Sequence, residues 1–170
     1  SGGVRAGEGM PEQRLTGKKL PNPKGKRRTL TVRHTTGHRI IAFVEIVSPA
    51  PGVLVCSPHS KVAEPGFVDA QLPTLNKLLE QLLASQDISA PVVWMYTPMA
   101  LPLLQGLDPA AVVYDCMDEL SAFLNAPREL LQREQELLKC ADVVFTGGPS
   151  LYRSKQALHP SDPMFPRLGA

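Results

Sequence analysis

The sequence predicts an α/β fold with a Rossmann-like parallel sheet covered by helices, and two observations carry that prediction. Two short apolar runs rich in β-branched residues, 112–114 and 143–145, each stop at a polar loop, as buried strands do. Between them lies a segment with leucines at helical spacing, residues 127–139. Strand, helix and strand joined by short loops form a βαβ unit, whose two strands run parallel.

Further elements extend this pattern in both directions along the chain. We expect a strand at 53–55, a leucine-lined helix at 72–83, a strand at 92–96 and a short helix at 99–105. The helix at 127–139 is expected to bury Leu130, Leu131, Leu137 and Leu138. Residues 52 to about 158 should therefore form one parallel sheet with helices on it, and residues 159–170 show no pattern.

The first fifty residues differ from the rest in charge and in pattern. They hold ten Lys and Arg against three Asp and Glu, whereas residues 51–170 hold eight against thirteen. Residues 1–28 are rich in Gly, Pro and basic residues and lack apolar periodicity, which predicts a flexible basic arm. Two β-rich runs, 29–34 and 39–49, flank a glycine turn at 36–38 and predict a β-hairpin.

The composition is that of an ordinary globular chain. With 43% hydrophobic residues among 170, the chain can bury a substantial core. No apolar run approaches the roughly 20 residues that cross a bilayer, and the first residues do not resemble a signal peptide, so a cytoplasmic location is expected. The three cysteines, Cys56, Cys116 and Cys140, lack CxxC spacing and predict reduced thiols, not a metal site.

Several motifs in the second half of the chain resemble a known family. YDCMDELSAF at 114–123, AP-x-x-L-x-x-x-E-x-x-L-L at 126–138 and ADVVFTGGPSLY at 141–152 occur in that order. They are similar to motifs in the N-terminal domain of bacterial GT-B glycosyltransferases of the family 1/4 type. The resemblance starts near Gly52, includes PVVWMYTPMALPLL at 91–104 and fades after His159.

The resemblance implies the acceptor-binding half of an enzyme that transfers a sugar from a nucleotide-sugar donor to a glycosyl acceptor. In such enzymes most donor contacts come from a C-terminal domain that residues 51–170 do not resemble. The chain is therefore expected to be a truncated enzyme that is inactive alone. No metal or other cofactor is expected, because GT-B enzymes stabilise the leaving diphosphate with protein groups and no DxD motif occurs. The donor sugar, the acceptor and the stereochemical outcome stay open.

Acidic residues that follow the strand at 112–114 are the candidate catalytic groups. Transfer with inversion needs a general base that deprotonates the acceptor hydroxyl, and Asp118 and Asp115 are the candidates for this role. Together with Glu119 they form a group of three acids, which tend to raise one another's pKa. The alternative is structural: Asp115 caps its own turn and Glu119 is merely solvated.

The candidate substrate-binding residues lie in the loops after the strands: Gly147, Gly148, Ser150, Glu119, His59 and Thr97. Two glycines allow the backbone to approach a ligand closely, and the N–H groups at the start of the next helix favour anions. The alternative for this loop is a tight turn with Ser150 as helix cap. The loop histidine and threonine are either cleft residues or bystanders.

A second resemblance leaves other functions open. VEIVSPAPGV at 44–53 is similar to a strand in an uncharacterised bacterial domain akin to the PD-(D/E)XK nuclease-like fold, but no Lys stands two residues after Glu45. The expected domains are therefore 1–28, a hairpin fragment of this second family at 29–50, and 51–170. The alternatives to a glycosyltransferase domain are a nuclease-like or nucleic-acid-binding module in the basic segment, and a non-functional fusion of gene fragments. Residues 1–28 lack an aromatic side chain to stack on bases, which counts against nucleic acid.

Overall fold

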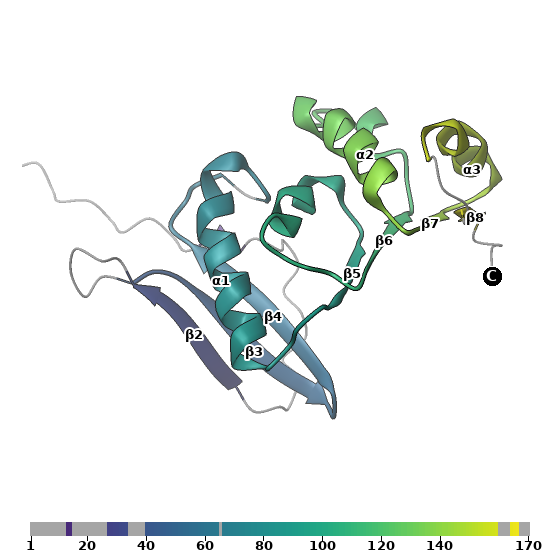
Figure 1. The fold of residues 1–170 in the computed structure, drawn as a ribbon. Helices are drawn as coiled ribbons and strands as arrows, with labels where there is room; N and C mark the ends of the chain where they lie inside the picture. The colour runs from purple at the N-terminus through teal and green to yellow at the C-terminus, as the bar shows by residue number, and fades with distance from the viewer. Residues whose placement is uncertain (1–12, 15–26, 34–39, 65, 160–163, 167–170) are drawn as a thin grey trace, which may run out of the picture. The chain divides into compact units, whose positions relative to one another are not determined.

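The computed structural model describes residues 13–14, 27–33, 40–64, 66–159 and 164–166 (Figure 1). They divide into two compact units, Ser1–Leu82 and Leu83–Ala170. The first unit contains an antiparallel sheet and the second a parallel sheet, so the chain is mixed α/β. Most of the predicted basic arm and all of the predicted glycine turn lie outside the described residues.

The first unit is built on a sheet in the order β1-β4-β3-β2. Its strands are β1 (Gln13–Arg14), β2 (Arg27–Arg33), β3 (Ile40–Ala50) and β4 (Val53–Ser60). The antiparallel pairing of β2 with β3 confirms the predicted hairpin. A second hairpin follows at once, because β3 and β4 are joined by only Pro51 and Gly52, and Gly52 has a φ of 75°. Pro followed by a glycine of positive φ suits the two central positions of a type II turn.

The prediction that residues 53–55 start the parallel sheet is wrong. β4 pairs antiparallel with β3, with Val47 opposite Val55 and Glu45 opposite Ser57. The physical reason is the length of the connection: two residues can reverse a chain, whereas a parallel pair needs a crossover of a dozen or more residues. The strand expected at the start of the region 51–170 therefore shares a sheet with the hairpin of residues 29–50.

Helix α1 (Leu72–Ser85) covers one face of this sheet, after the short 3₁₀ helix η1 (Asp69–Gln71). Leu78 is buried against Ala42, Val44 and Ile46, which alternate along β3 and so share one face. Gln71, the last residue of η1, is fully buried just before α1 begins. Its side chain accepts a hydrogen bond from Ser60 Oγ at 3.1 Å and donates one to the carbonyl oxygen of Glu64. These bonds tie the end of β4 to the helix.

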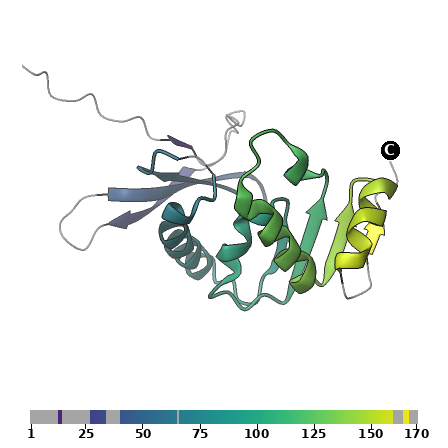
Figure 2. The same ribbon diagram turned by 90° about the horizontal axis from the view of Figure 1, so that it is seen from above.

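The second unit is a parallel sheet in the order β5-β6-β7-β8 (Figure 2). The strands are β5 (Val92–Met95), β6 (Ala111–Cys116), β7 (Val143–Thr146) and β8 (Met164–Pro166). The connections contain η2 (Pro98–Leu104), η3 (Leu120–Ala122), α2 (Arg128–Cys140), α3 (Pro149–Lys155) and η4 (Gln156–Leu158). The predicted βαβ unit is present, and β8 adds a strand where the sequence showed no pattern.

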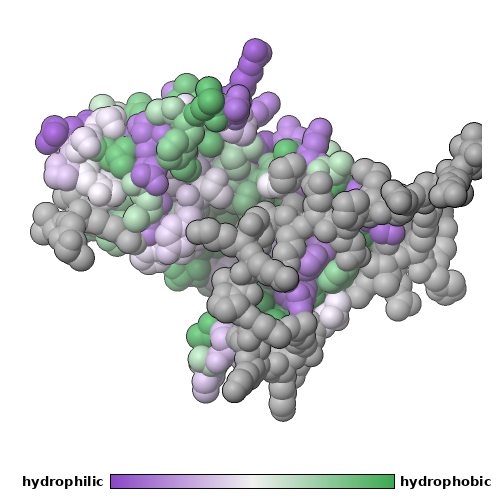
Figure 3. Space-filling model, turned by 180° about the vertical axis from the view of Figure 1, so that it is seen from behind, coloured by the Kyte–Doolittle hydropathy of each residue, from purple (hydrophilic) through white to green (hydrophobic). Residues whose placement is uncertain are grey.

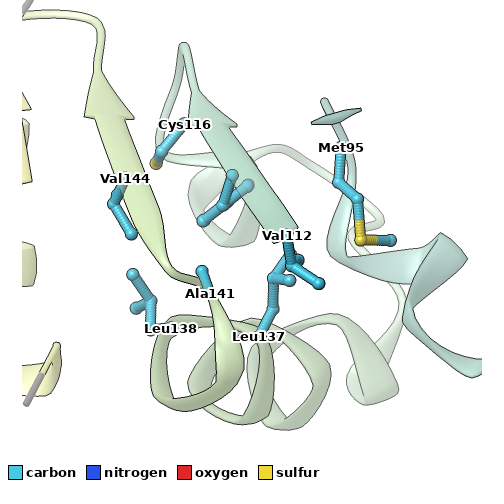
Figure 4. Packing of buried hydrophobic residues seen from close by; sticks show 8 residues of the cluster. Met95, Val112, Cys116, Leu137, Leu138, Ala141 and Val144 are labelled. Atoms are coloured by element: carbon cyan, nitrogen blue, oxygen red, sulfur yellow. The ribbon is translucent and has the colours of Figure 1, made fainter. Parts of the chain in front are cut away.

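The core of this unit lies between the sheet and α2. Val112, Tyr114 and Cys116 alternate along β6 and belong to one buried cluster with Leu137 and Leu138 of the helix. Figure 4 shows this cluster from close by. Residues from η2 and α3 pack against the same cluster. Three of the four leucines that were expected to be buried are buried, whereas the fourth, at position 131, is 51% exposed because it lies on the outer side of the helix.

Among the described residues, η2, α2 and α3 pack on one face of the sheet, against the same buried cluster. The strand order follows the chain order without reversal, and right-handed crossovers that always move in one direction place every helix on the same side. The opposite face carries Trp94, Phe145 and Phe165, whose rings lie in a row. The described strands therefore form a one-sided parallel layer, without the reversal of strand order that defines a doubly wound Rossmann fold.

Exposed apolar side chains are spread over both the sheet and the loops. The largest exposed fractions among them belong to Leu124, Tyr96, Val92 and Phe123. Figure 3 shows hydrophobic residues, in green, interspersed with hydrophilic ones on the face turned to the viewer. Within the described ranges, the helices are all too short or too polar to cross a bilayer.

Candidate functional site

The candidate site lies at the carboxyl edge of the parallel sheet, where β6 and β7 end. These strands pair with Asp115 beside Phe145 and Cys116 beside Thr146. The loops that follow them are therefore neighbours, as expected for parallel strands. The N–H of Gly147 donates to the carbonyl oxygen of Cys116 at 2.8 Å. This bond joins the acidic loop, residues 115–119, to the glycine loop, residues 146–150.

Gly147 is required by the contact between these two loops. A Cβ atom at this position would lie 2.1 Å from the carbonyl oxygen of Met117, far inside van der Waals contact. Gly148 differs, because a Cβ there would have nothing within 4 Å and its φ of 171° is an extended conformation open to any residue. Packing therefore accounts for the first glycine of the loop and leaves the second unexplained.

Asp115 is fully buried on the sheet face opposite to α2. Its Oδ2 accepts a hydrogen bond from the indole Nε1 of Trp94 at 3.1 Å, and Trp94 stacks on Phe145 with ring centroids 5.4 Å apart. The aromatic rings thus cover the carboxylate. This placement gives Asp115 a direct role in fixing Trp94 and the end of β6, and it keeps the carboxylate away from solvent.

Asp118 has the opposite environment, because it is exposed at the tip of the acidic loop. Its backbone makes two local contacts: the carbonyl oxygen accepts from the N–H of Leu120 at 3.0 Å and lies 3.7 Å from Cys116 Sγ. The residue before it, Met117, packs against Gly147, and the residue after it, Glu119, is held by its side chain. The structure therefore presents one carboxylate to solvent on a well-anchored loop.

Glu119 is held by a buried lysine from α3. Lys155 Nζ donates to Glu119 Oε1 at 2.7 Å and to Glu134 Oε2 at 2.8 Å, and we call these two contacts the lysine bridge. Lys155 is 4% exposed and Glu134, from α2, 1% exposed, whereas the Glu119 side chain is 38% exposed. Ser121 Oγ also donates to Glu119 Oε1, at 2.8 Å. The alternative of a merely solvated Glu119 is therefore wrong.

The lysine bridge continues into the sheet through the other oxygen of Glu134. Tyr114 Oη donates to Glu134 Oε1 at 2.9 Å, and Cys116 Sγ lies 3.8 Å from the same oxygen. Burial, together with the neighbouring Cys116 and Glu134, raises the pKa of the Tyr114 hydroxyl, which therefore stays protonated as the donor. Burial is likewise the main reason why the pKa of the Cys116 thiol is raised.

The pKa of Glu119 is lowered from its ordinary value and the pKa of Lys155 is raised. Burial works to raise the pKa of Glu119, but hydrogen bonds from Lys155 and Ser121 outweigh it and lower that pKa. Burial works to lower the pKa of Lys155, but the bonds and charges of Glu119 and Glu134 outweigh it and raise that pKa. The predicted mutual raising of acid pKa values therefore does not hold for Glu119, because its closest charged neighbour is a cation.

Two further candidate residues make local contacts. Thr97 Oγ1 accepts from the N–H of Met99 at 3.3 Å and so caps η2. Ser150 is exposed inside the first turn of α3, whose N-cap is Gly148 without a side-chain cap bond, so the alternative of Ser150 as helix cap is wrong. Both residues lie in loops or turns that follow strands of the parallel sheet.

His59 belongs to the first unit and is not part of this sheet edge. It lies near the end of β4, is 8% exposed and stacks on Phe43 with ring centroids 4.4 Å apart. Its Nε2 lies 4.0 Å from Glu45 Oε2. The sequence placed His59 after the first strand of the parallel sheet. This placement is wrong, because that strand belongs to the antiparallel sheet of the first unit.

Sequence reasoning missed the lysine bridge. Lys155 is not among the candidate residues singled out from the sequence, and Glu134 occurs in a family motif without an assigned role. One signal was present: Glu134 occupies the apolar stripe of its helix, four residues after Leu130 and three before Leu137. An acid at such a position is buried when the helix packs, and a buried acid needs a partner.

Compared with protein-family models, curated proteins and solved structures, the chain matches none of them. In the part of the chain that the structure describes, no group of three or more His, Cys, Asp and Glu side chains is arranged to hold a metal ion. The interpretation of the site therefore depends on the geometry given above and on the motifs in the sequence.

We predict that Gly147→Ala destabilises the chain and Gly148→Ala does not. The new methyl group at position 147 collides with the backbone of Met117, and overpacking of this kind costs about 1–3 kcal/mol. Position 148 has room and an extended backbone, so Ala should change the free energy of unfolding by less than about 0.5 kcal/mol. Urea denaturation followed by circular dichroism measures both; equal stabilities of the two variants would contradict the close contact of the loops.

We predict that Asp115→Asn lowers stability. The change weakens a buried hydrogen bond in which the acceptor carries charge, and such bonds contribute about 1.5–3 kcal/mol. Trp94 is the chain's one tryptophan, so its fluorescence reports directly on the bond partner during denaturation. An unchanged unfolding midpoint together with an unchanged emission maximum would show that Asp115 does not fix Trp94.

The pH dependence of stability follows from the lysine bridge. The folded pKa of Glu119 lies below the unfolded value of about 4.3, so its contribution is present above that pH and is lost as pH falls through the folded pKa. The folded pKa of Lys155 lies above about 10.4, so its contribution is present below that pH and is lost as pH rises through the folded pKa. We expect the stability difference between the native chain and Glu119→Ala to stay constant near neutral pH and to shrink below about pH 4. Denaturation over a pH series measures it.

Proposed function

We propose that this chain provides the acceptor-binding half of a glycosyltransferase, with the carboxyl edge of β6 and β7 as its site. One observation carries the proposal: Asp118 is an exposed carboxylate on a loop anchored on both sides, at the sheet edge where ligands bind in parallel α/β proteins. The motifs around this loop and around the glycine loop are those that resemble GT-B enzymes.

The chemistry of this proposal needs one carboxylate and few other groups. In an inverting transfer, the base takes the proton of the acceptor hydroxyl while the oxygen forms a bond to the anomeric carbon, and the nucleoside diphosphate leaves with the electrons of the broken bond. Asp118 is the group suited to receive that proton because it is exposed, whereas Asp115 is enclosed by Trp94 and Phe145. Glu119 is engaged with Lys155 and is the weaker candidate.

The donor is proposed to bind mainly outside these 170 residues. In GT-B enzymes the nucleotide contacts a second domain, and the family resemblance of this chain covers only the first. The start of α3 offers little to a diphosphate, because this helix has seven residues and begins with Pro149, which has no N–H. We therefore propose that the chain alone binds acceptors in preference to nucleotide sugars and that transfer needs a donor-binding domain.

Binding by the 170-residue chain tests the first half of this proposal. Amide NMR spectra are recorded during titration with UDP-glucose, with GDP-mannose and with a panel of methyl glycosides and disaccharides. We expect an acceptor sugar to shift the amides of the acidic and glycine loops, and the nucleotide sugars to bind with Kd values above about 1 mM. Tight nucleotide-sugar binding, or acceptor shifts confined to the first unit, would refute the assignment.

Asp118→Asn tests the proposed base, with Asp108→Asn as the matched control. Asp108 is also exposed, but it precedes β6 and so lies near the opposite end of the same strand. In the chain joined to the donor-binding domain of a GT-B enzyme, we expect Asp118→Asn to reduce turnover by about 10²- to 10⁴-fold, the usual contribution of a general base. Asp108→Asn should leave turnover unchanged. Near-normal turnover of Asp118→Asn would show that the acidic loop is structural.

A second candidate function, a nuclease-like or nucleic-acid-binding module, is favoured by the positive charge of the first fifty residues, and in the same unit the acid Glu45 lies near His59. Both side chains lie on the sheet face opposite to that of Val44 and Ile46, which α1 covers. An affinity for duplex DNA that falls steeply with salt and is lost when residues 1–28 are deleted would support this function over the first.

A further inference from the structure

The acidic loop is held on its first side by the contact between Met117 and Gly147, whereas the segment after Asp118 is held by fewer contacts. Between Asp118 and Phe123, the backbone bonds are local: Leu120 N–H donates to the oxygen of Asp118, Ala122 N–H to that of Glu119, and Phe123 N–H to that of Leu120. Such short-range bonds do not fix a loop relative to its surroundings. One contact that does so is made by the side chain of Glu119, which reaches Lys155 on a different element.

Lys155 is also held by a contact that does not involve the loop. Its second carboxylate partner, Glu134, is 1% exposed and is fixed by the hydroxyl of Tyr114 at 2.9 Å. Three elements, α3, α2 and β6, thus determine the position of one ammonium group. An ammonium group held in this way can fix the loop relative to the sheet and helices, because charge-assisted hydrogen bonds are short and directional.

We propose that Lys155 is a positioning residue, which sets the direction of the Asp118 carboxylate by holding the neighbouring Glu119 against the sheet edge. The inference rests on the proposed function, since it is the base Asp118 that the lysine bridge would position. It adds a role for a buried side chain that the proposed chemistry does not otherwise use. The ammonium contacts neither the acceptor nor the donor in this proposal, and it acts only through the loop.

Two variants separate the loop contact from the buried pair. Glu119→Ala removes the loop partner and leaves Lys155 bonded to Glu134, so the core should keep its fold. Lys155→Met removes both contacts and leaves Glu134 buried without its cation, and Lys155→Arg restores the charge. Lys139→Met is the matched control, because Lys139 is an exposed lysine in the last turn of α2.

Hydrogen exchange of the 170-residue chain is the first readout. We expect Glu119→Ala to speed the exchange of the Leu120, Ala122 and Phe123 amides by about tenfold, the loss of one charge-assisted bond, and to leave the β6 and α2 amides within about twofold. Lys139→Met should change none of them. Unchanged exchange in Glu119→Ala would overturn the proposal, and so would an equal acceleration of loop and core amides.

The titration of Glu119 is the second readout, because it reports whether the ion pair between Lys155 and Glu119 is present in solution. Carboxyl carbon NMR of the native chain should show Glu119 titrating below its ordinary pKa. Lys155→Met should return it to the ordinary range, and Lys155→Arg should keep it low. If Lys155→Met does not fold, the exchange of Glu119→Ala and the titration in Lys155→Arg still decide. An ordinary pKa for Glu119 in the native chain would refute the bridge.

The third readout links the bridge to catalysis and separates the two proposals. In the chain joined to a donor-binding domain, Glu119→Ala should lower kcat about tenfold and leave the KM for the donor unchanged. If Asp118→Asn retains full turnover while the exchange and titration results hold, the proposed function fails and the bridge stands. If Asp118→Asn is inactive while Glu119→Ala keeps full kcat, the function stands and the positioning role is refuted.

Discussion

The second unit depends on one buried cation. Lys155 joins α3 to the acidic loop and to α2, and through Glu134 it reaches the tyrosine of the central strand. Removing one partner of a buried ion pair leaves the other charge buried without compensation. This lowers the free energy of unfolding by about 3–5 kcal/mol. The elements around the carboxyl edge therefore hold their mutual positions as a set. Apolar packing of α2 on the sheet supplies the bulk of the burial, and the cation specifies the arrangement at one end of it.

Two different kinds of contact hold the loop that carries Asp118. A backbone contact, Gly147 on Met117, fixes the loop on one side. An ion pair fixes it on the other. Below it in the strand, Asp115 is turned to the other face of the sheet and accepts a bond from Trp94. One strand end thus carries a structural acid and an exposed acid three residues apart, with environments different enough to give them separate roles.

The sequence predicted the local pattern of the chain better than its long-range partners. Apolar runs and helical leucine spacing located β6, α2 and β7, because periodicity reports directly on burial. The same kind of run at 53–55 was assigned to the wrong sheet, since periodicity does not distinguish parallel from antiparallel strands. The two-residue turn before this run indicates an antiparallel pair, because a parallel pair needs a longer connection.

The candidate site shows the same division between local and long-range information. The acids and glycines at the ends of β6 and β7 could be found from their position after strands, and parallel pairing brings them together. The lysine bridge could not be found in this way, because Glu119, Glu134 and Lys155 are far apart in the chain and meet only once the helices have packed. β8 escaped notice for a related reason: three residues ending in a proline carry no period.

The strand order of the second unit has a consequence for how such a layer grows. Each connection between the described strands moves across the sheet in one direction. The helices lie on one side of the sheet, and Trp94, Phe145 and Phe165 line the other. A strand that came after β8 in a chain and lay beside β5 would have to travel back across the sheet. Its right-handed connection would then pass over the aromatic row and cover it. The crevice created by that reversal would open at the carboxyl end of β5, one strand away from Asp118.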